Sequence, residues 1–354
     1  MPCGDAVTEA GRHMFPMDTP VAIAGAGSIG CYVGGCLALA GRSVTLLARP
    51  YIADAIQHHG MRLVDLDGKV RSLAPQAVGV TEEPAMALAQ ARIVLVTVKS
   101  GATAEMGQLI AAHARPDVVV LSLQNGVRNA DKLRSTLGRT VLAGMVPFNV
   151  VQSSGDHGEA VFHRTTSGQC LIQAGAPGLA DFLDVEGAPF GESGEIEAVL
   201  WGKLLLNLNN ALNALSGLPL AQQLADRRWR LILADQIAEA LAVMGKAGVR
   251  PARAGGPSPA LLPPLLRLPD FLFKWLARRT LSVDPAARSS MWEDFERRRK
   301  TEIDEFQGAL LRLAEASGSD APLSRRIVAL VRDAERENRG SPELSPESVR
   351  RGQS

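Results

Sequence analysis

The chain has 354 residues, of which 46% are hydrophobic and 21% charged, and its formal net charge at pH 7 is +1. This composition is typical of a soluble globular protein with room for two domains, and it gives no reason to expect a nucleic acid or a membrane surface as partner. No apolar run approaches the roughly twenty residues of a membrane-spanning helix. The four cysteines lack metal-ligand spacing, so no metal site is predicted and a reduced, cytoplasmic compartment is favoured.

Both ends of the chain are predicted to be disordered. Residues 1–19 contain no apolar segment of the kind found in secretory signals, and Met14 or Met17 could be an alternative start. Residues 339–354 are rich in serine, proline and charge, a composition that does not support a packed core.

The first predicted elements surround a glycine motif. An apolar run at Val21–Ala24 is expected to form a buried strand, and a run rich in alanine and leucine is expected to form a helix that ends at Gly41. A second strand is expected at Val44–Ala48, and glycines in G-x-G-x-x-G spacing separate the first strand from the helix. This strand, turn, helix and strand within about thirty residues are the context of a dinucleotide-binding site.

Each glycine of the motif has a physical role in that interpretation. Gly25 permits the tight turn, Gly27 lets the backbone approach a pyrophosphate, and Gly30 allows the helix to pack closely on the strand. The N-terminus of the helix adds unpaired N–H groups and the positive end of its dipole. The alternative is a glycine-rich turn that binds no ligand. The predicted cofactor loop consists of Gly25, Ala26, Gly27, Ser28, Ile29 and Gly30.

The end of the second strand indicates which dinucleotide binds. An NAD site usually carries Asp or Glu about twenty residues after the glycines, to accept from the ribose hydroxyls. Here the strand ends in LLAR at 46–49 without an acid. Arg49 is therefore predicted to hold the adenosine 2′-phosphate, because guanidinium matches phosphate geometry and stays charged. An exposed loop arginine is the alternative, and the predicted cofactor is NADPH/NADP⁺.

Polar residues follow two further strands. Residues 93–98 and 118–122 are apolar runs typical of buried parallel strands, with Lys99 after the first and Asn125 shortly after the second. Because ligands bind beyond the carboxyl ends of such strands, Lys99 is expected to meet a cofactor phosphate or ribose. The amide of Asn125 can bond to the nicotinamide side and to a substrate oxygen. A solvated lysine and an Asn-Gly turn are the alternatives.

The remaining elements change in character along the chain. A short helix at 52–60, a hairpin at 61–77 with its turn at Asp67-Gly68, a helix at 85–91 and strands at 141–146 and within 155–174 complete the first half. Helices are expected at 195–215, 220–248, 292–317 and 322–337. We therefore predict a Rossmann-type doubly wound α/β domain at 20–190 and an all-α domain at 191–338.

The first of these long helices carries a polar stripe. Lys203, Asn207 and Asn210 are spaced i, i+4 and i+7, which predicts that they share one helical face among leucines. Buried polar groups are costly unless paired, so the stripe suggests a lined site, with amides bonding neighbouring helices as the alternative. A lysine that faces a nicotinamide could donate a proton to an oxygen on which negative charge develops. Farther on, RRRKTEID at 297–304 alone is typical of a charged helix face.

Together these stretches resemble the ketopantoate reductase (2-dehydropantoate 2-reductase) family. The matching motifs are GAGSIG at 25–30, LLAR at 46–49, VTVKS at 96–100, LQNGV at 123–127, WGKLLLN at 201–207, EALAVMGKAG at 239–248, SSMWED at 289–294 and TEID at 301–304. They span roughly residues 20–338. The resemblance implies a C-terminal domain like that of 6-phosphogluconate dehydrogenase and an NADP-dependent oxidoreductase acting on CH–OH groups, which converts 2-dehydropantoate to (R)-pantoate for pantothenate and coenzyme A synthesis.

The resemblance also implies roles for single residues. Lys203 would be the general acid, Glu302 would orient the substrate or Lys203, Asn207 would bind substrate hydroxyls, and Ser290 would hold the substrate carboxylate. Glu239 matches a further acid near the family's site.

In the first domain, the resemblance implies that Asn125 contacts both cofactor and substrate. Arg49 and Lys99 would recognise the phosphate and ribose of NADPH.

The sequence departs from the family pattern at one position and raises a question of geometry at another. The family often has a second asparagine eight residues after the lysine, where this chain has Ala211, and Asn210 could compensate. The substrate could therefore be another branched 2-keto acid or an imino acid. Ser290 and Glu302 would be about 18 Å apart on one straight helix, so both can reach a small keto acid only if the helix starts late or bends.

Two questions stay open at the level of the sequence. A nucleotide sensor that binds NADP(H) without turnover is the non-enzymatic alternative, against which Lys203 and Glu302 argue, since a sensor needs no general acid. Helical domains of this kind can build a homodimer interface, but nothing in the sequence counts subunits.

Overall fold

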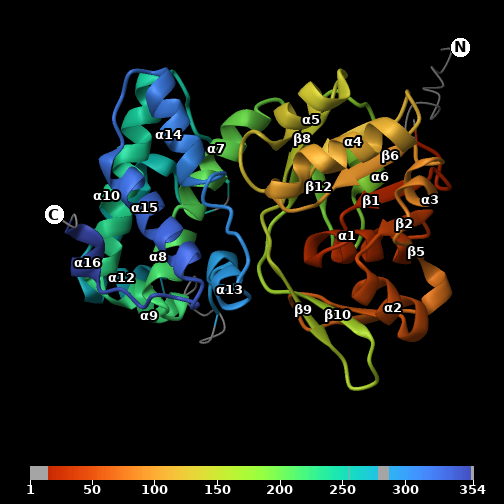
Figure 1. Ribbon diagram of the computed structural model, residues 1–354, viewed down its shortest axis with the longest axis horizontal. Coiled ribbons are helices and arrows are strands. Elements are labelled where there is room, and N and C mark those ends of the chain that lie inside the picture. The colour runs from red at the N-terminus through yellow and green to blue at the C-terminus, as the bar shows by residue number, and fades with distance from the viewer. Residues whose placement is uncertain (1–14, 255, 278–286, 352–354) are drawn as a thin grey trace, which may run out of the picture. The chain divides into compact units, whose positions relative to one another are not determined.

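The computed structural model describes residues 15–254, 256–277 and 287–351 of the chain (Figure 1). By its internal contacts the chain divides into two compact units, each with its own hydrophobic core. Unit 1 comprises residues 1–125 and 129–196, and unit 2 comprises residues 126–128 and 197–354. The division at residue 196 follows the last strand of unit 1, whereas the sequence places the boundary at residue 190.

Unit 1 is built around an eight-stranded sheet with the order β12-β11-β8-β7-β6-β1-β2-β5. Neighbours from β5 to β8 are all parallel, whereas β11 runs antiparallel to β8 and parallel to β12. The chain builds β1, β2 and β5 toward one edge and then returns to β6, so the topological switch point lies between β1 and β6. The strands are β1 (Val21–Ala24), β2 (Val44–Leu47), β5 (Gly79–Thr81), β6 (Ile93–Val96), β7 (Val119–Ser122), β8 (Leu142–Met145), β11 (Cys170–Gln173) and β12 (Phe190–Ser193).

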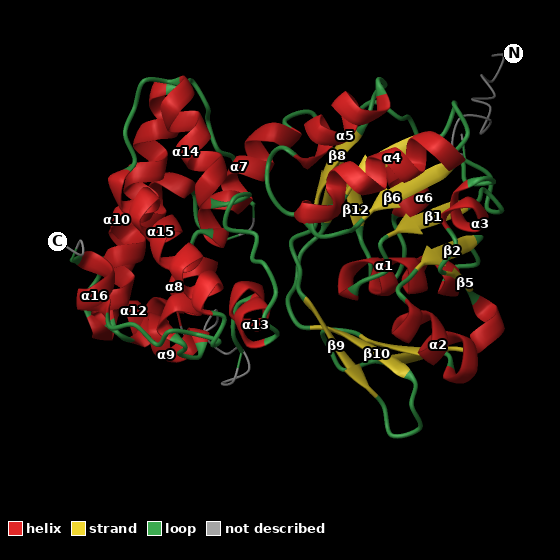
Figure 2. Ribbon diagram, in the orientation of Figure 1, coloured by secondary structure: helices red, strands yellow, loops and turns green. Residues whose placement is uncertain are grey.

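Helices connect these strands and lie on both faces of the sheet (Figure 2). Helix α1 covers one face, while α4 and α5 lie side by side on the other. All residues of β1 and β6 are buried, as the continuous apolar runs predict for parallel strands covered on both faces. The helical elements of unit 1 are α1 (Ser28–Leu39), α2 (Pro50–His59), α3 (Pro84–Leu88), α4 (Thr103–His113), α5 (Asn129–Leu137), α6 (Leu179–Leu183) and the 3₁₀ turns η1 (Pro75–Ala77) and η2 (Ser100–Ala102).

A second, four-stranded sheet has the order β4-β3-β10-β9. Its strands are β3 (Met61–Val64), β4 (Val70–Leu73), β9 (Val150–Ser154) and β10 (Ala160–Arg164). The predicted hairpin is confirmed, since β3 and β4 pair in antiparallel fashion around Gly68 at φ 82°. The expected strands within 155–174 divide between the two sheets, because β10 pairs with β3 and β11 joins the large sheet.

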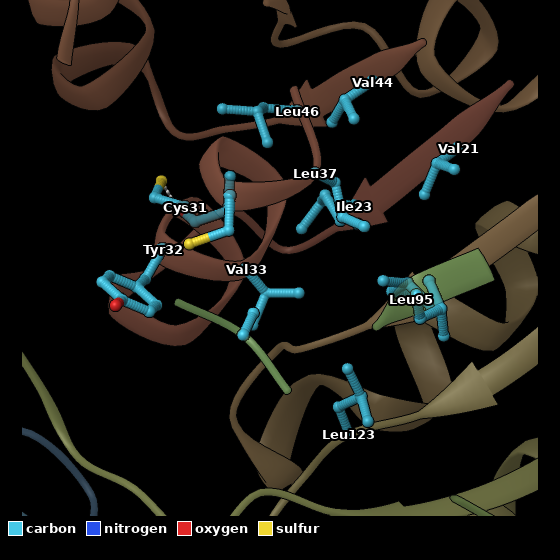
Figure 3. Close-up of a cluster of buried hydrophobic side chains, with 14 of the residues drawn as sticks. Val21, Ile23, Cys31, Tyr32, Val33, Leu37, Val44, Leu46, Leu95 and Leu123 are labelled. Carbon is cyan, nitrogen blue, oxygen red and sulfur yellow. Dashed lines mark hydrogen bonds between the residues drawn. The ribbon is translucent and has the colours of Figure 1, made fainter. Parts of the chain in front are cut away.

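Helix α1 packs against both sheets, which explains its unusual composition. It contacts β1 and β2 of the large sheet as well as β3, β9 and β10 of the small one. Figure 3 shows side chains of α1, among them Val33 and Leu37, beside Ile23 and Leu46 of the large sheet. Its cysteines, Cys31 and Cys36, are buried, as the sequence indicated, and burial raises the pKa of the Cys36 thiol to about 11.

The structure differs from the sequence prediction at both ends of the chain. Residues 1–14 lie outside the described residues, but Phe15 packs against Phe182, with 5.8 Å between the ring centroids. The prediction of a disordered tail from residue 339 is wrong for the described residues up to 351, which include helix α16 (Pro346–Arg350). Val349 is fully buried, and Ser345 caps the helix by accepting from Ser348 N. Serine followed by proline is a signal for the start of a helix. The prediction gave more weight to the polar composition of this segment than to that signal.

Unit 2 is helical, and three of its expected long helices are interrupted. The helix predicted at 195–215 breaks at Leu208, the one at 220–248 breaks at Asp226, and the one at 292–317 is non-helical from 297 to 306. Its elements are α7 (Ile196–Asn207), α8 (Asn209–Ser216), α9 (Leu220–Ala225), α10 (Arg227–Lys246), η3 (Pro259–Leu261), α11 (Leu262–Leu266), α12 (Asp270–Ala277), α13 (Ser290–Glu296), α14 (Gln307–Ala316), α15 (Pro322–Glu337) and α16. Within the described ranges, no helix combines the length and apolar character that a membrane crossing requires.

Candidate functional site

The glycine loop lies between β1 and α1, and its three glycines meet different surroundings. Gly25 has a φ of 100°, and a Cβ there would lie 2.3 Å from Val98 Cγ1. A Cβ at Gly30 would lie 2.5 Å from Thr97 Oγ1. At Gly27, by contrast, a Cβ would have no heavy atom within 4 Å. Two glycines are thus required by the protein's own packing, and the third borders open space.

The carboxyl end of β6 holds this loop in place. Thr97 Oγ1 donates to the carbonyl of Gly25 at 2.7 Å, and Thr97 N donates to that of Ala24 at 3.0 Å. Helix α1 begins with Gly27 as its N-cap, without a side-chain cap and without an acid in its first turn. Its first N–H groups therefore suit an anion, and the loop fits the pyrophosphate of a dinucleotide.

Arg49 lies directly after β2, where it is the N-cap residue of α2. Its side chain is exposed, and its guanidinium carbon lies 5.8 Å from the centroid of the Tyr51 ring. The first turn of α2 has no acid, and Arg49 forms no ion pair with any described residue. A cation in this setting can bind a phosphate, as the sequence predicts.

Lys99 and Asn125 follow the neighbouring parallel strands β6 and β7. Lys99 is exposed and Asn125 is half-buried. The backbone carbonyl of Asn125 accepts from Asn129 Nδ2 at 2.5 Å and from Ser100 Oγ at 3.4 Å, and Asn129 Nδ2 also reaches Ser100 Oγ at 2.9 Å. The two loops that carry Lys99 and Asn125 are therefore joined by hydrogen bonds.

A buried polar network beneath these loops was missed by the sequence reasoning. Gln124 Nε2 donates to the Val98 carbonyl at 3.0 Å and to Thr103 Oγ1 at 2.7 Å, and Thr103 Oγ1 donates to Asn129 Oδ1 at 3.0 Å. Gln124, Thr103 and Asn129 are all buried. A satisfied buried network of this kind fixes the positions of the loops it joins. The available signal was a glutamine in the residues that directly follow an apolar strand.

In unit 2, Lys203 and Asn207 lie one turn apart on α7, and both are half-buried. Asn210 does not lie on the same uninterrupted helix, because α7 ends at Asn207 and Asn210 lies on α8, although Leu208 between them keeps right-handed helical angles. At the break, the Leu208 carbonyl accepts a hydrogen bond from the buried side chain of Gln307, whose Nε2 lies 3.0 Å away.

Ser290 and its neighbour Ser289 have different roles at the start of α13. Ser289 is buried and caps the helix by accepting from Trp292 N, and its Oγ donates to the Asn210 carbonyl at 3.0 Å. Ser290 is exposed and free of these structural tasks. Glu302 is half-buried in the non-helical segment between α13 and α14. Ser290 and Glu302 thus do not share one straight helix, and the 18 Å separation expected on such a helix does not apply.

A second network that the sequence reasoning missed supports this region. Gln223 Nε2 donates to Asn209 Oδ1 at 3.1 Å, and Asn213 Nδ2 donates to Gln223 Oε1 at 3.1 Å. Asn213 Oδ1 accepts from Ser289 N at 2.8 Å. Asn209 and Asn213 of α8 are therefore buried structural amides outside the predicted stripe, whereas Asn210 is half-buried.

The comparisons with known proteins identify the family. The model of the family described as Ketopantoate reductase PanE/ApbA matches residues 21–177, and that of its C-terminal domain matches residues 195–335. The chain belongs to the ketopantoate reductase family. It is thus an oxidoreductase of that family.

Individual relatives agree over nearly the whole chain. The 2-dehydropantoate 2-reductase of Archaeoglobus fulgidus is 27% identical over 324 residues, which are 89% of this chain and 97% of that protein. A crystal structure of a PanE/ApbA family ketopantoate reductase from Ralstonia eutropha JMP134 is 32% identical, with a TM-score of 0.73, covering 90% of this chain and 99% of that one. D-mandelate dehydrogenase, solved with NADH and anilino(oxo)acetate, shares the fold with a TM-score of 0.73 at 21% identity, covering 90% of this chain and 99% of its own.

Ala211 and Glu239, which the resemblance singled out, both have structural roles in this member of the ketopantoate reductase family. Ala211 is fully buried in the apolar core of unit 2, so position 211 offers no polar group. The carboxylate of Glu239 accepts from Leu323 N at 2.8 Å and Ser324 N at 2.9 Å, and thereby caps helix α15. In the structure, Glu239 therefore serves as a helix cap, and we do not assign it to the site.

Proposed function

We propose that the chain catalyses the NADPH-dependent reduction of 2-dehydropantoate to (R)-pantoate, the step that supplies pantoate for pantothenate and coenzyme A synthesis. The observation that carries the proposal is the half-buried pair of Lys203 and Asn207 on α7, in a member of the ketopantoate reductase family. A proton donor beside a hydroxyl-binding amide suits the reduction of a hydroxylated keto acid.

The residues of unit 1 fit the cofactor. The glycine loop and the N-terminus of α1 would hold the pyrophosphate, and Arg49 would bind the 2′-phosphate that distinguishes NADPH from NADH. Lys99 would contact the ribose or a phosphate, and Asn125 the nicotinamide side and the substrate. When bound, NADPH supplies the hydride for the keto carbon.

The residues of unit 2 would bind the substrate and supply the proton. The Lys203 ammonium donates a proton to the keto oxygen as negative charge develops there, which lowers the barrier. Asn207 and Asn210 bind substrate hydroxyls, Ser290 donates to the carboxylate, and Glu302 orients the substrate or Lys203. The reaction thus draws on residues of both units.

The proposal is tested by steady-state kinetics with NADPH and a panel of 2-keto acids. We expect 2-dehydropantoate to have the highest kcat/KM, and we expect Lys203→Ala to lower kcat by about 10²- to 10⁴-fold, the usual contribution of general acid catalysis. Lys274→Ala, which removes an exposed lysine of α12, serves as the matched control and should leave kcat unchanged. Wild-type turnover in Lys203→Ala would remove that residue from its role.

A second candidate function is the reduction of another branched 2-keto acid or of an imino acid. It is favoured by Ala211, which leaves Asn210 as the polar residue at this point of α8. The fold does not choose between the substrates, because D-mandelate dehydrogenase shares it. A higher kcat/KM for any other acid of the panel would establish this candidate instead. Tight NADPH binding without turnover on any of them would favour a sensor.

The proposed compartment is the cytoplasm and the proposed assembly is a homodimer. The cysteines in the described residues are free and buried, which fits a reducing compartment. A structural neighbour from Staphylococcus aureus is described as a dimeric ketopantoate reductase. Light scattering coupled to size-exclusion chromatography measures the mass directly.

A further inference from the structure

A cavity of about 340 Å³ lies in unit 2, lined by residues that follow α13 and by residues at the C-terminal end of α15. Four cationic residues, Arg298, Arg299, Lys300 and Arg336, and the acidic residue Glu335 line it, and Arg298, Arg299 and Lys300 are exposed. None of the residues assigned to the proposed reduction lines it. The proposed function therefore leaves this charged cavity unexplained.

The residues that line the cavity carry more positive than negative charge, since Arg298, Arg299, Lys300 and Arg336 stand against Glu335. Among the described residues, no side chain forms an ion pair or hydrogen bond with those of Arg298, Arg299 or Lys300. Arg336, the fourth cation of the wall, differs because it pairs with Asp333. Arg297, outside the wall, has its Nη2 3.8 Å from Glu293 Oε2.

The one carboxylate in the wall, that of Glu335, keeps its charge and is held by hydrogen bonds to Thr301. Glu335 Oε1 accepts from Thr301 N at 2.8 Å and from Thr301 Oγ1 at 2.7 Å. Three adjacent cations therefore repel one another around a concave surface, an arrangement that an anion would stabilise.

The backbone of the wall is also unusual. Arg298 and Asn338 have φ angles of 51° and 52°, and only one other non-glycine residue in the described chain, Glu343, has a positive φ. Arg298 ends α13 in a turn in which its N–H bonds to the Phe295 carbonyl and the N–H of Arg299 bonds to that of Asp294. Glycine is the usual residue at such a position, because it has no Cβ to strain this conformation. What arginine adds there is a cationic side chain on the cavity.

We propose that this cavity binds a small ligand through a phosphate group, such as pyrophosphate or a phosphate monoester. Guanidinium groups present paired N–H donors that match two phosphate oxygens, and two of them are adjacent here. The volume lies at the lower end of small-molecule pockets, which suits one or two phosphates with a small organic group. The charged wall excludes a mainly apolar ligand.

The experiment must separate this site from the glycine loop of unit 1, which can also take phosphate. Gly27→Asp blocks that loop, because a carboxylate at the N-terminus of α1 repels phosphate while the open space at Gly27 accepts the side chain. Aspartate is also a preferred N-cap, so the variant should fold. Pyrophosphate is then titrated calorimetrically into Gly27→Asp at constant ionic strength.

We expect Gly27→Asp to bind pyrophosphate, and we expect Arg298→Gly or Arg299→Gln in that background to weaken the binding at least tenfold. Arg298→Gly relieves the backbone, so its melting temperature should not fall, and Arg299→Gln provides a second variant if it does. Arg297→Gln, which removes a neighbouring arginine outside the cavity wall, is the matched control and should bind within twofold of the background.

Three results would overturn the proposal. Pyrophosphate binding that disappears with Gly27→Asp alone would belong to unit 1. Equal weakening by Arg297→Gln and Arg298→Gly would show a general effect of surface charge. Absence of binding at millimolar pyrophosphate would show that the cavity takes no phosphate. None of these outcomes depends on turnover, so the proposed reduction can fail or succeed separately.

Discussion

Gly25 and Gly27 are two residues apart in one loop, yet an alanine should have opposite effects at the two positions. At Gly25 the φ of 100° and the 2.3 Å approach to Val98 Cγ1 leave no room for a Cβ. The left-handed conformation alone costs an alanine about 1–2 kcal/mol, and the overlap adds to it. We therefore expect Gly25→Ala to lower the free energy of unfolding by at least that amount, as measured by urea denaturation without cofactor.

Gly27→Ala should instead leave the free energy of unfolding within about 0.5 kcal/mol of the wild-type value, as for a substitution that meets no neighbour. Its methyl group would occupy the space that we assign to the pyrophosphate, so the Kd for NADPH should rise at least tenfold. The quenching of tryptophan fluorescence on NADPH addition would measure it. Unchanged NADPH affinity in a folded Gly27→Ala protein would contradict the placement of the pyrophosphate.

Arg49 carries the choice of NADPH over NADH. It is exposed and forms no ion pair with the described residues, so its removal should not destabilise the fold. A lost hydrogen bond to a charged group is worth about 1.5–3 kcal/mol, so Arg49→Ala should raise the KM for NADPH by about 10- to 100-fold. The KM for NADH should change little. An equal rise for both cofactors would show that Arg49 does not bind the 2′-phosphate.

At the scale of elements, α7 is held close to the chain that follows α10. A Cβ on Gly202, the residue before Lys203, would lie 1.8 Å from the carbonyl oxygen of Ala252, whose N–H donates to the Ala198 carbonyl at 2.8 Å. Gly202→Ala should therefore push the two segments apart and lower the free energy of unfolding by about 1–3 kcal/mol, as overpacking does. The reductase activity should fall with it, because Lys203 moves with α7.

The control for this prediction is Gly245→Ala on α10, where a Cβ would meet no atom within 4 Å. Alanine is favoured over glycine in an exposed helix by up to about 1 kcal/mol, so this variant should be more stable than the wild type. Urea denaturation of both variants provides the measurement. A stabilised Gly202→Ala protein would show that α7 can shift without cost.

The same elements show what could be predicted from the sequence. The glycine motif and the buried strands were predictable because their signals are local, in the spacing of glycines and in continuous apolar runs. Of the breaks in the helices, the one at Asp226 has a local signal, an aspartate that caps α10, whereas the causes of the other two lie elsewhere in the chain or in an unusual residue. Gln307, 99 residues away, bonds to the Leu208 carbonyl, and Arg298 adopts a left-handed conformation without being glycine.

The candidate site divides in the same way. The positions of Arg49, Lys99 and Asn125 after parallel strands were predictable from the apolar runs that precede them, and their roles stay predictions. The networks around Gln124 and Gln223 were not, because hydrogen bonds between buried amides leave no periodic pattern in the sequence. The same limit applies to neighbouring serines, since only their contacts distinguish the capping Ser289 from the exposed Ser290.

For the whole molecule, the two separate hydrophobic cores predict how the protein unfolds. The core of unit 1 contains residues of both of its sheets, and that of unit 2 is formed by its helices. A unit with its own core can unfold cooperatively by itself. Differential scanning calorimetry should therefore resolve two transitions. Gly25→Ala should lower the midpoint temperature of the transition of unit 1, and Gly202→Ala should lower that of unit 2.

A ligand assigns the transitions independently of the variants. NADP⁺ binds the folded form of unit 1 in our proposal. By mass action it should therefore raise the free energy of unfolding of that unit by about 2.7 kcal/mol at one hundred times its Kd, and with it the midpoint temperature of that unit's transition. Pyrophosphate in the Gly27→Asp background should raise the transition of unit 2 instead. If a single transition responds to both ligands and to both variants, the chain unfolds as one cooperative body, and the two cores are not independent in solution.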